Sequence, residues 1–114
     1  MPNDIGSHFK TREPAVKKIY DCLVTKCRTF GPVEVESKQT SIHLVNRSAF
    51  AGVHPRKRYL NLEIVLSRRL ASSRVDRVDQ VSANRYHHRF KLVAAADIDT
   101  ELSGWLREAY ELKG

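Results

Sequence analysis

Hydrophobic residues near the N-terminus repeat at helical spacing. Between residues 11 and 31 they recur every three or four positions and would share one side of a helix: Val16, Ile19, Tyr20, Leu23, Val24, Cys27 and Phe30. Thr11 is the expected N-cap, and Pro14 suits the first turn because its missing N–H needs no partner there. Gly31 followed by Pro32 ends the helix. Residues 1–10 show no period, and we expect a loose arm there.

From residue 33 the period falls to two, which is typical of strands. Alternation predicts strands at 33–36, 42–44, 49–54, 58–66 and 86–93, separated by turn sequences. The segment 58–66 is the clearest, with one apolar face formed by Leu60, Leu62, Ile64 and Leu66. Val75, Val78 and Val81 are spaced by three, which fits neither period, and we expect an irregular or bulged strand there.

A second amphipathic helix is predicted from about residue 98, with Asp97 as its N-cap. Its apolar side carries Ile98, Leu102, Trp105, Leu106, Ala109 and Tyr110. Connections of hairpin length imply antiparallel pairing, because a parallel crossover needs a dozen or more residues. We therefore predict an α+β fold, an antiparallel sheet of about five strands packed with an N-terminal and a C-terminal helix. The face of the sheet that carries Arg89 and Lys91 is expected to be wet or used for binding.

Length and composition fit one domain, residues 1–114, with an apolar fraction of 41%. No stretch approaches the roughly 18 consecutive apolar residues that cross a bilayer, so no membrane association is expected. The N-terminus lacks an apolar signal region. Cys22 and Cys27 would lie about 140° apart around one helix, which disfavours a disulfide between them. Together these features predict a cytoplasmic protein.

The net charge of +7 is concentrated in the middle of the chain. Residues 56–91 contain ten Lys/Arg against three acids, a surplus of seven that equals the net charge of the whole chain. The set comprises Arg56, Lys57, Arg58, Arg68, Arg69, Arg74, Arg77, Arg85, Arg89 and Lys91, with Tyr59 and Tyr86 beside it. Such a segment suits an anionic partner, nucleic acid above all. The alternative is that the charge serves solubility alone.

Motifs of common catalytic and cofactor sites are absent from the sequence. It contains no glycine-rich phosphate loop, no serine elbow and no cysteine pairs at metal-ligand spacing, so no cofactor and no metal are predicted. His87 shares its face with Arg89, which favours a solvated basic strand or a phosphate contact. His88 shares its face with Phe90, which favours a core histidine held by a hydrogen bond. Glu63 is interpreted as an ordinary cross-strand ion pair with nearby Arg or Lys.

Two groups of candidate binding residues follow. If the turns before residues 42 and 60 lie at one end of the sheet, their cations would form a rim for an anion. The anion-binding candidates are Lys38, Arg56, Lys57, Arg58, His87, Arg89 and Lys91. A pocket between helices and sheet is the alternative, lined by Phe50, Tyr59, His88 and Trp105.

Four stretches also carry a resemblance to a known family. They are His8-Phe9 before the helix that ends in Phe30-Gly31-Pro32; residues 37–42; residues 50–62 around Pro55-Arg56-Lys57-Arg58; and residues 86–92 together with 101–110. The chain resembles a bacterial family of domains of unknown function, whose members occur as short stand-alone proteins and as the C-terminal domain of predicted transport proteins. The resemblance implies a compact α+β unit and no catalytic residue.

The sequence therefore predicts a binding module for an anionic partner, with nucleic acid as one such partner, and not an assembled enzyme site. A small-molecule domain and a protein-interaction module that uses a sheet edge or the C-terminal helix remain open alternatives. The oligomeric state, monomer or dimer, is also open.

Overall fold

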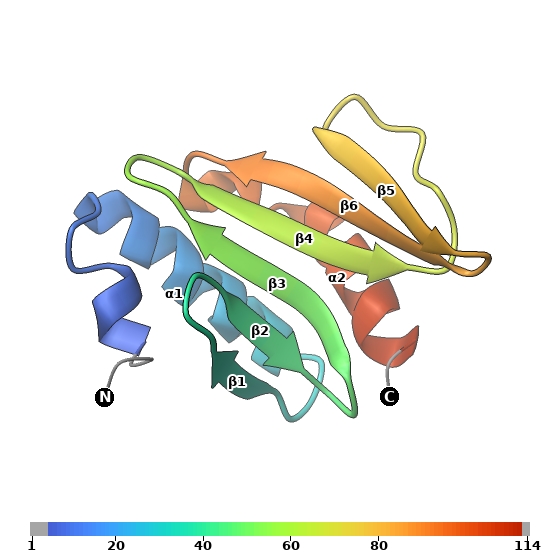
Figure 1. Cartoon of the computed structure of the whole chain (residues 1–114), viewed down its shortest axis with the longest axis horizontal. Coiled ribbons are helices and arrows are strands. Elements are labelled where there is room, and N and C mark those ends of the chain that lie inside the picture. The colour runs from blue at the N-terminus through green and yellow to red at the C-terminus, as the bar shows by residue number, and fades with distance from the viewer. Residues whose placement is uncertain (1–4, 113–114) are drawn as a thin grey trace.

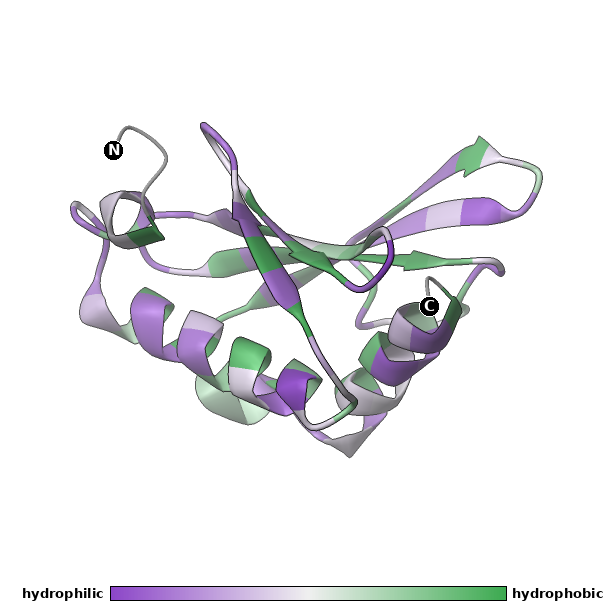
Figure 2. Ribbon diagram, turned by 90° about the horizontal axis from the view of Figure 1, so that it is seen from below, coloured by the Kyte–Doolittle hydropathy of each residue, from purple (hydrophilic) through white to green (hydrophobic). Residues whose placement is uncertain are grey.

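The computed structural model describes residues 5–112, which form one six-stranded antiparallel sheet with both α-helices packed on the same face (Figures 1 and 2). The elements, in chain order, are the 3₁₀ helix η1 (Ile5–His8), α1 (Pro14–Arg28), β1 (Glu34–Ser37), β2 (Ile42–Val45), β3 (Ala49–Pro55), β4 (Leu60–Leu66), β5 (Arg77–Ser82), β6 (Arg85–Leu92), the 3₁₀ helix η2 (Ala95–Asp97) and α2 (Thr100–Leu112). The predicted α+β class is confirmed. The valine segment supplies the sixth strand, β5, and its pairing shifts register between Gln80 and Ser82, as expected of a bulged strand.

The strand order is β1-β2-β3-β4-β6-β5. Residues 67–76 carry the chain past β6, so that β6 returns beside β4 and β5 becomes an edge strand (Figure 1). Leu60 at the start of β4 pairs with Leu92 at the end of β6. The β1–β2 turn, the β3–β4 turn and the last residues of β6 therefore lie at one end of the sheet, which we call the turn end.

The inner face of the sheet forms the core with the two helices. Leu60, Leu62, Ile64 and Leu66 of β4 have no exposed surface, as their alternation predicts. His88 is equally buried, and its Nε2 accepts a 3.0 Å hydrogen bond from the Leu70 N–H, which confirms the predicted core histidine. Since Nε2 accepts this bond, the ring proton is on Nδ1. Burial lowers the pKa of His88 below its ordinary value and favours the neutral ring.

Both predicted helix caps are wrong. α1 begins after Glu13, which makes no side-chain cap; its N–H instead donates to the Lys57 carbonyl at 2.9 Å. Asp97 lies in η2, and it is Asp99 whose Oδ1 accepts the 3.0 Å hydrogen bond from the Leu102 N–H at the start of α2. A short helical turn thus separates the predicted cap from the helix.

The expectation of a loose arm over residues 1–10 is also wrong from residue 5 onward, while residues 1–4 lie outside the described part. Residues 5–8 form η1, and both His8 and Phe9 are buried. The Phe9 ring lies 5.1 Å from the Tyr20 ring of α1, measured between centroids. This aromatic contact holds the segment against the helix although the segment has no hydrophobic period.

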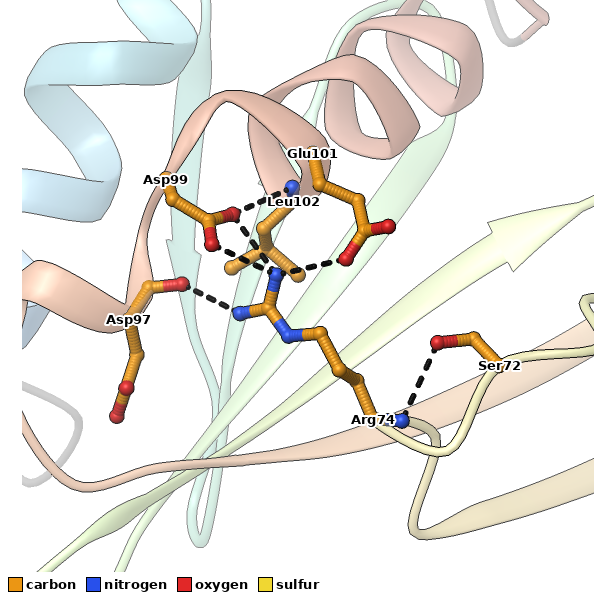
Figure 3. A network of polar contacts seen from close by, with 6 residues as sticks. All are labelled: Ser72, Arg74, Asp97, Asp99, Glu101 and Leu102. Carbon is orange, nitrogen blue, oxygen red and sulfur yellow. Dashed lines mark hydrogen bonds and ion pairs between the residues drawn. The ribbon is translucent and has the colours of Figure 1, made fainter.

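Arg74 fixes the long segment 67–76 to the start of α2 (Figure 3). Its Nη1 lies 2.8 Å from Asp99 and 3.1 Å from Glu101, and its Nη2 donates to the Asp97 carbonyl at 2.7 Å. Arg74 belongs to the basic set of the sequence, but its guanidinium is bound to groups of the domain itself.

Two further features concern the cysteines and the helices. Cys22 is exposed and Cys27 is buried; both are free, and burial raises the pKa of the Cys27 thiol to about 12. No helix among residues 5–112 has the length and apolar character needed to cross a bilayer.

Candidate functional site

The open face of the sheet, which no helix covers, carries a line of basic side chains along β6. Its successive outward residues are Arg85, His87, Arg89 and Lys91, which we call the basic stripe. Alternate residues of a strand lie about 7 Å apart, so the stripe extends about 20 Å. Among the described residues, no carboxylate lies within ion-pair distance of its Arg and Lys side chains.

The stripe reaches the turn end. Lys91 Nζ lies 4.5 Å from the centroid of the Tyr59 ring, a cation–π contact. Tyr59 closes the β3–β4 turn, where its carbonyl accepts a 2.8 Å hydrogen bond from the Arg56 N–H. Arg56 and Lys57 of this turn are exposed. The β3–β4 turn therefore adjoins the Lys91 end of the stripe, and we call the two together the cationic surface.

Three of the seven anion-binding candidates have acidic partners: Lys38, Arg58 and His87, whose Nδ1 lies 2.9 Å from Glu63 Oε1. Lys38, in the β1–β2 turn, lies 3.6 Å from Glu36, and Arg58 lies 3.6 Å from Glu13. Both pairs are exposed, so they are weak and screened by salt. The remaining four candidates have no acidic partner among the described residues: Arg89 and Lys91 belong to the stripe, and Arg56 and Lys57 to the β3–β4 turn.

A polar cavity of about 350 Å³, which we call the end cavity, opens at the turn end. It is lined by Ser7, His8, Arg12, Gln39, Thr40, His54, Pro55 and Arg56. None of the lining residues, all within the described range 5–112, is a carboxylate. His8 Nε2 lies 2.9 Å from Ser37 Oγ, and burial lowers the pKa of His8. Arg12 donates to the His8 carbonyl through Nη1, while its buried Nε has no hydrogen-bond partner.

A second cavity of about 250 Å³ lies on the open face above Gly52, with His43, Glu63, Arg85 and His87 in its walls. Glu63 Oε1 is 2.9 Å from His87 Nδ1, and Oε2 is 3.6 Å from His54 Nε2. These two imidazoles, His54 and His87, outweigh burial and lower the pKa of the Glu63 carboxyl from 4.5 to about 2. Glu63 therefore pairs with histidines diagonally across the sheet, and the expected Arg or Lys partner is wrong.

Donor geometry for a metal is absent from this face: residues 5–112 contain no group of three His, Cys, Asp or Glu side chains that could hold an ion. The Glu63 carboxylate is already occupied by its two imidazole neighbours. The face offers the cations of β6 and hydrogen-bonding groups. Three of its carboxylates are paired: Glu36 with Lys38, Glu63 with His54 and His87, and Asp79 with Arg77.

The four pocket candidates are not brought together. Phe50 and His88 are fully buried in the core. Trp105 of α2 stacks on Phe90 with ring centroids 5.4 Å apart, and Tyr59 lies at the turn end beside Lys91. The three cavities described, including one of about 410 Å³ between α1 and residues 95–98, are lined by other residues.

Sequence reasoning did not select Arg12, His8 or His54 for the site. Arg12 and His8 fall in and next to the segment without period, so nothing in the pattern indicates a fixed position for them. His54 ends a short strand whose partners depend on strand order. Arg85 belongs to the basic set but precedes the predicted strand by one residue.

Comparison with known proteins gives a family and no function. A model of the family described as domain of unknown function (DUF5655) matches residues 5–113. Searches of curated proteins and of solved structures found no match. The match extends over nearly the whole chain, including both helices and all six strands, and the protein therefore belongs to the DUF5655 family of domains of unknown function.

Proposed function

We propose that this domain binds nucleic acid through the phosphate backbone, using the basic stripe and the β3–β4 turn. The observation that carries the proposal is that three of the four successive outward side chains of β6, Arg85, Arg89 and Lys91, are cations with no acidic partner among the described residues, on the face of the sheet that no helix covers. Arg and Lys that have no acidic partner are free to neutralise phosphates and release condensed counterions.

The arrangement favours backbone contacts over base recognition. The outward residues of the stripe are cations and a histidine, whereas Tyr86, which alternates with them, has the inward parity of His88 and Phe90. Tyr59 is the aromatic ring beside the cationic surface, and Lys91 already lies over it. Stacking platforms normally need several exposed rings. Binding should therefore show little sequence preference and a strong dependence on salt.

The same proposal places the domain in the cytoplasm. The two free cysteines suit a reducing compartment, where disulfides rarely persist.

A direct test is fluorescence anisotropy with labelled single-stranded DNA, duplex DNA and RNA, at low and at physiological salt. The proposal predicts binding at low salt that weakens steeply as salt rises. Absence of binding at low salt would refute it, because a domain of charge +7 with an open cationic face should show at least non-specific affinity. Small ligands and protein partners would then be the next candidates.

A further inference from the structure

The end cavity lies where the cationic surface stops. The β3–β4 turn contributes Arg56 to the cavity and, through Tyr59, also meets Lys91 at the end of the stripe. Its other lining residues come from η1, from the segment between η1 and α1, and from the β1–β2 turn. An extended chain on the stripe would therefore lead into a hollow enclosed by three segments.

The charged side chains that line the end cavity are positive and therefore favour an anionic ligand. Arg12 and Arg56 are its permanently charged lining residues, and both are cations. The acid nearest in sequence, Glu13, is engaged with Arg58 at 3.6 Å. Thr40, Gln39 and His8 add neutral hydrogen-bonding groups. Two guanidinium groups with hydroxyl and amide donors are a typical phosphate-binding set.

One hydrogen-bond donor of the Arg12 side chain has no partner in the protein. Its Nη1 donates to the His8 carbonyl, but its Nε is buried and has no partner. A buried donor without an acceptor is unfavourable. Because this Nε has no exposed surface, a phosphate in the cavity would meet the positive charge of the Arg12 guanidinium and not this atom.

We propose that the end cavity binds the terminal phosphomonoester of a nucleic acid strand whose backbone lies along the basic stripe. This inference rests on the proposed function. A phosphomonoester carries about −1.5 to −2 charges near pH 7, more than the single charge of a backbone diester. Two arginines therefore favour a terminal phosphate over an internal one.

The test compares three single-stranded oligonucleotides of one sequence, each with an internal fluorophore: one with a 5′-phosphate, one with a 3′-phosphate and one with hydroxyls at both ends. At physiological salt we expect one phosphorylated form to bind at least about tenfold tighter than the hydroxyl form, equivalent to about 1.4 kcal/mol. The two phosphorylated arms also show which end is recognised.

Variants locate the effect. Arg56→Gln should remove the preference for the phosphate end. Because Arg56 also belongs to the β3–β4 turn that contacts the backbone, this variant is read from the ratio of the affinities for the phosphorylated and hydroxyl forms, which should fall to about one, and not from either affinity alone. Arg12→Gln should also remove the preference. Arg12 contacts the His8 carbonyl, so this variant can also destabilise the fold. Arg56 is exposed, and Arg56→Gln therefore tests the proposal even if Arg12→Gln does not fold. Arg47→Gln is the matched control: it loses the same charge in the β2–β3 turn at the opposite end of the sheet, and it should retain the preference.

Equal affinity for all three oligonucleotides would overturn the terminal-phosphate proposal while leaving the backbone proposal intact. A preference that survives Arg56→Gln would overturn it too. Failure of every oligonucleotide to bind would instead refute the proposed function, and this inference with it.

Discussion

Gly31, which follows the end of α1, adopts a backbone conformation that other residues avoid. Its φ is +151°, and a Cβ built there would collide with the hydroxyl of Tyr110 in α2. That hydroxyl donates a 3.0 Å hydrogen bond to the carbonyl of Pro32. Gly31→Ala therefore introduces backbone strain and displaces an interaction that ties the end of α1 to α2. Gly104, within α2, is the natural comparison, because a Cβ added there meets no atom within 4 Å.

The two substitutions should have opposite signs. Backbone strain at Gly31 costs on the order of 1–3 kcal/mol, and loss of the Tyr110 hydrogen bond adds about 1 kcal/mol. Reduced entropy of the unfolded chain offsets about 0.5–1 kcal/mol. Gly31→Ala should therefore lower the free energy of unfolding by about 1–3.5 kcal/mol, or the Tm by about 4–14 °C for a chain of this size. Gly104→Ala should raise it by about 0.5–1 kcal/mol, because alanine is the better helix former.

Urea unfolding followed by circular dichroism measures both effects, provided that the m-value is unchanged. Tyr110→Phe separates the two contributions at Gly31. Once the hydroxyl is gone, Gly31→Ala should cost about 1 kcal/mol less than in the wild-type background. An equal cost in both backgrounds would show that Tyr110 plays no part, and a neutral Gly31→Ala would refute the conformation assigned to this residue.

Three further predictions follow from the polar contacts and the thiols. Because the folded-state pKa of Glu63 is about 2, below its ordinary 4.5, its contacts with His54 and His87 stabilise the fold above about pH 4.5, and this contribution is lost as pH falls toward 2. Glu63→Gln should lower stability by about 1–3 kcal/mol at pH 7 and converge with wild type near pH 2 in urea titrations. Arg74→Gln should accelerate amide hydrogen exchange at the start of α2, and unchanged exchange would contradict the anchoring role. A thiol reagent should modify Cys22 in the native protein and Cys27 only after unfolding; rapid reaction of both would contradict the burial of Cys27.

Local patterns in the sequence predicted most elements, because apolar residues that repeat at the period of a helix or a strand fall on one face, which the core then buries. The apolar faces of β4 and of both helices repeat so regularly that their existence follows from side-chain geometry. Helix starts were less accessible, because Thr11 and Asp97 are good capping residues that lie two or three positions before the helices. Which acceptor is used depends on tertiary contacts, such as the bond from the Glu13 N–H to the Lys57 carbonyl.

The candidate site was predictable only in the part that lies on a single strand. Strand parity places His87, Arg89 and Lys91 on one face without knowledge of the fold. The end cavity required strand order and the position of η1, which pattern reasoning cannot supply. Lys38 shows a second limit: its exposed pair with Glu36 depends on side-chain positions that charge counting ignores.

The central claim, that the basic stripe contacts phosphates, is tested most directly by the salt dependence of binding to a single-stranded oligonucleotide with hydroxyl ends. Two double variants lose the same charge: Arg89→Gln with Lys91→Gln on the stripe, and Lys18→Gln with Arg28→Gln on exposed positions of α1, on the opposite side of the sheet. Each phosphate contact contributes about −0.7 to the slope of log K against log salt for single strands. We predict that the stripe variant makes this slope shallower by about 1.4, while the helix variant leaves it unchanged. Equal changes in both variants, or no change in either, would contradict the account.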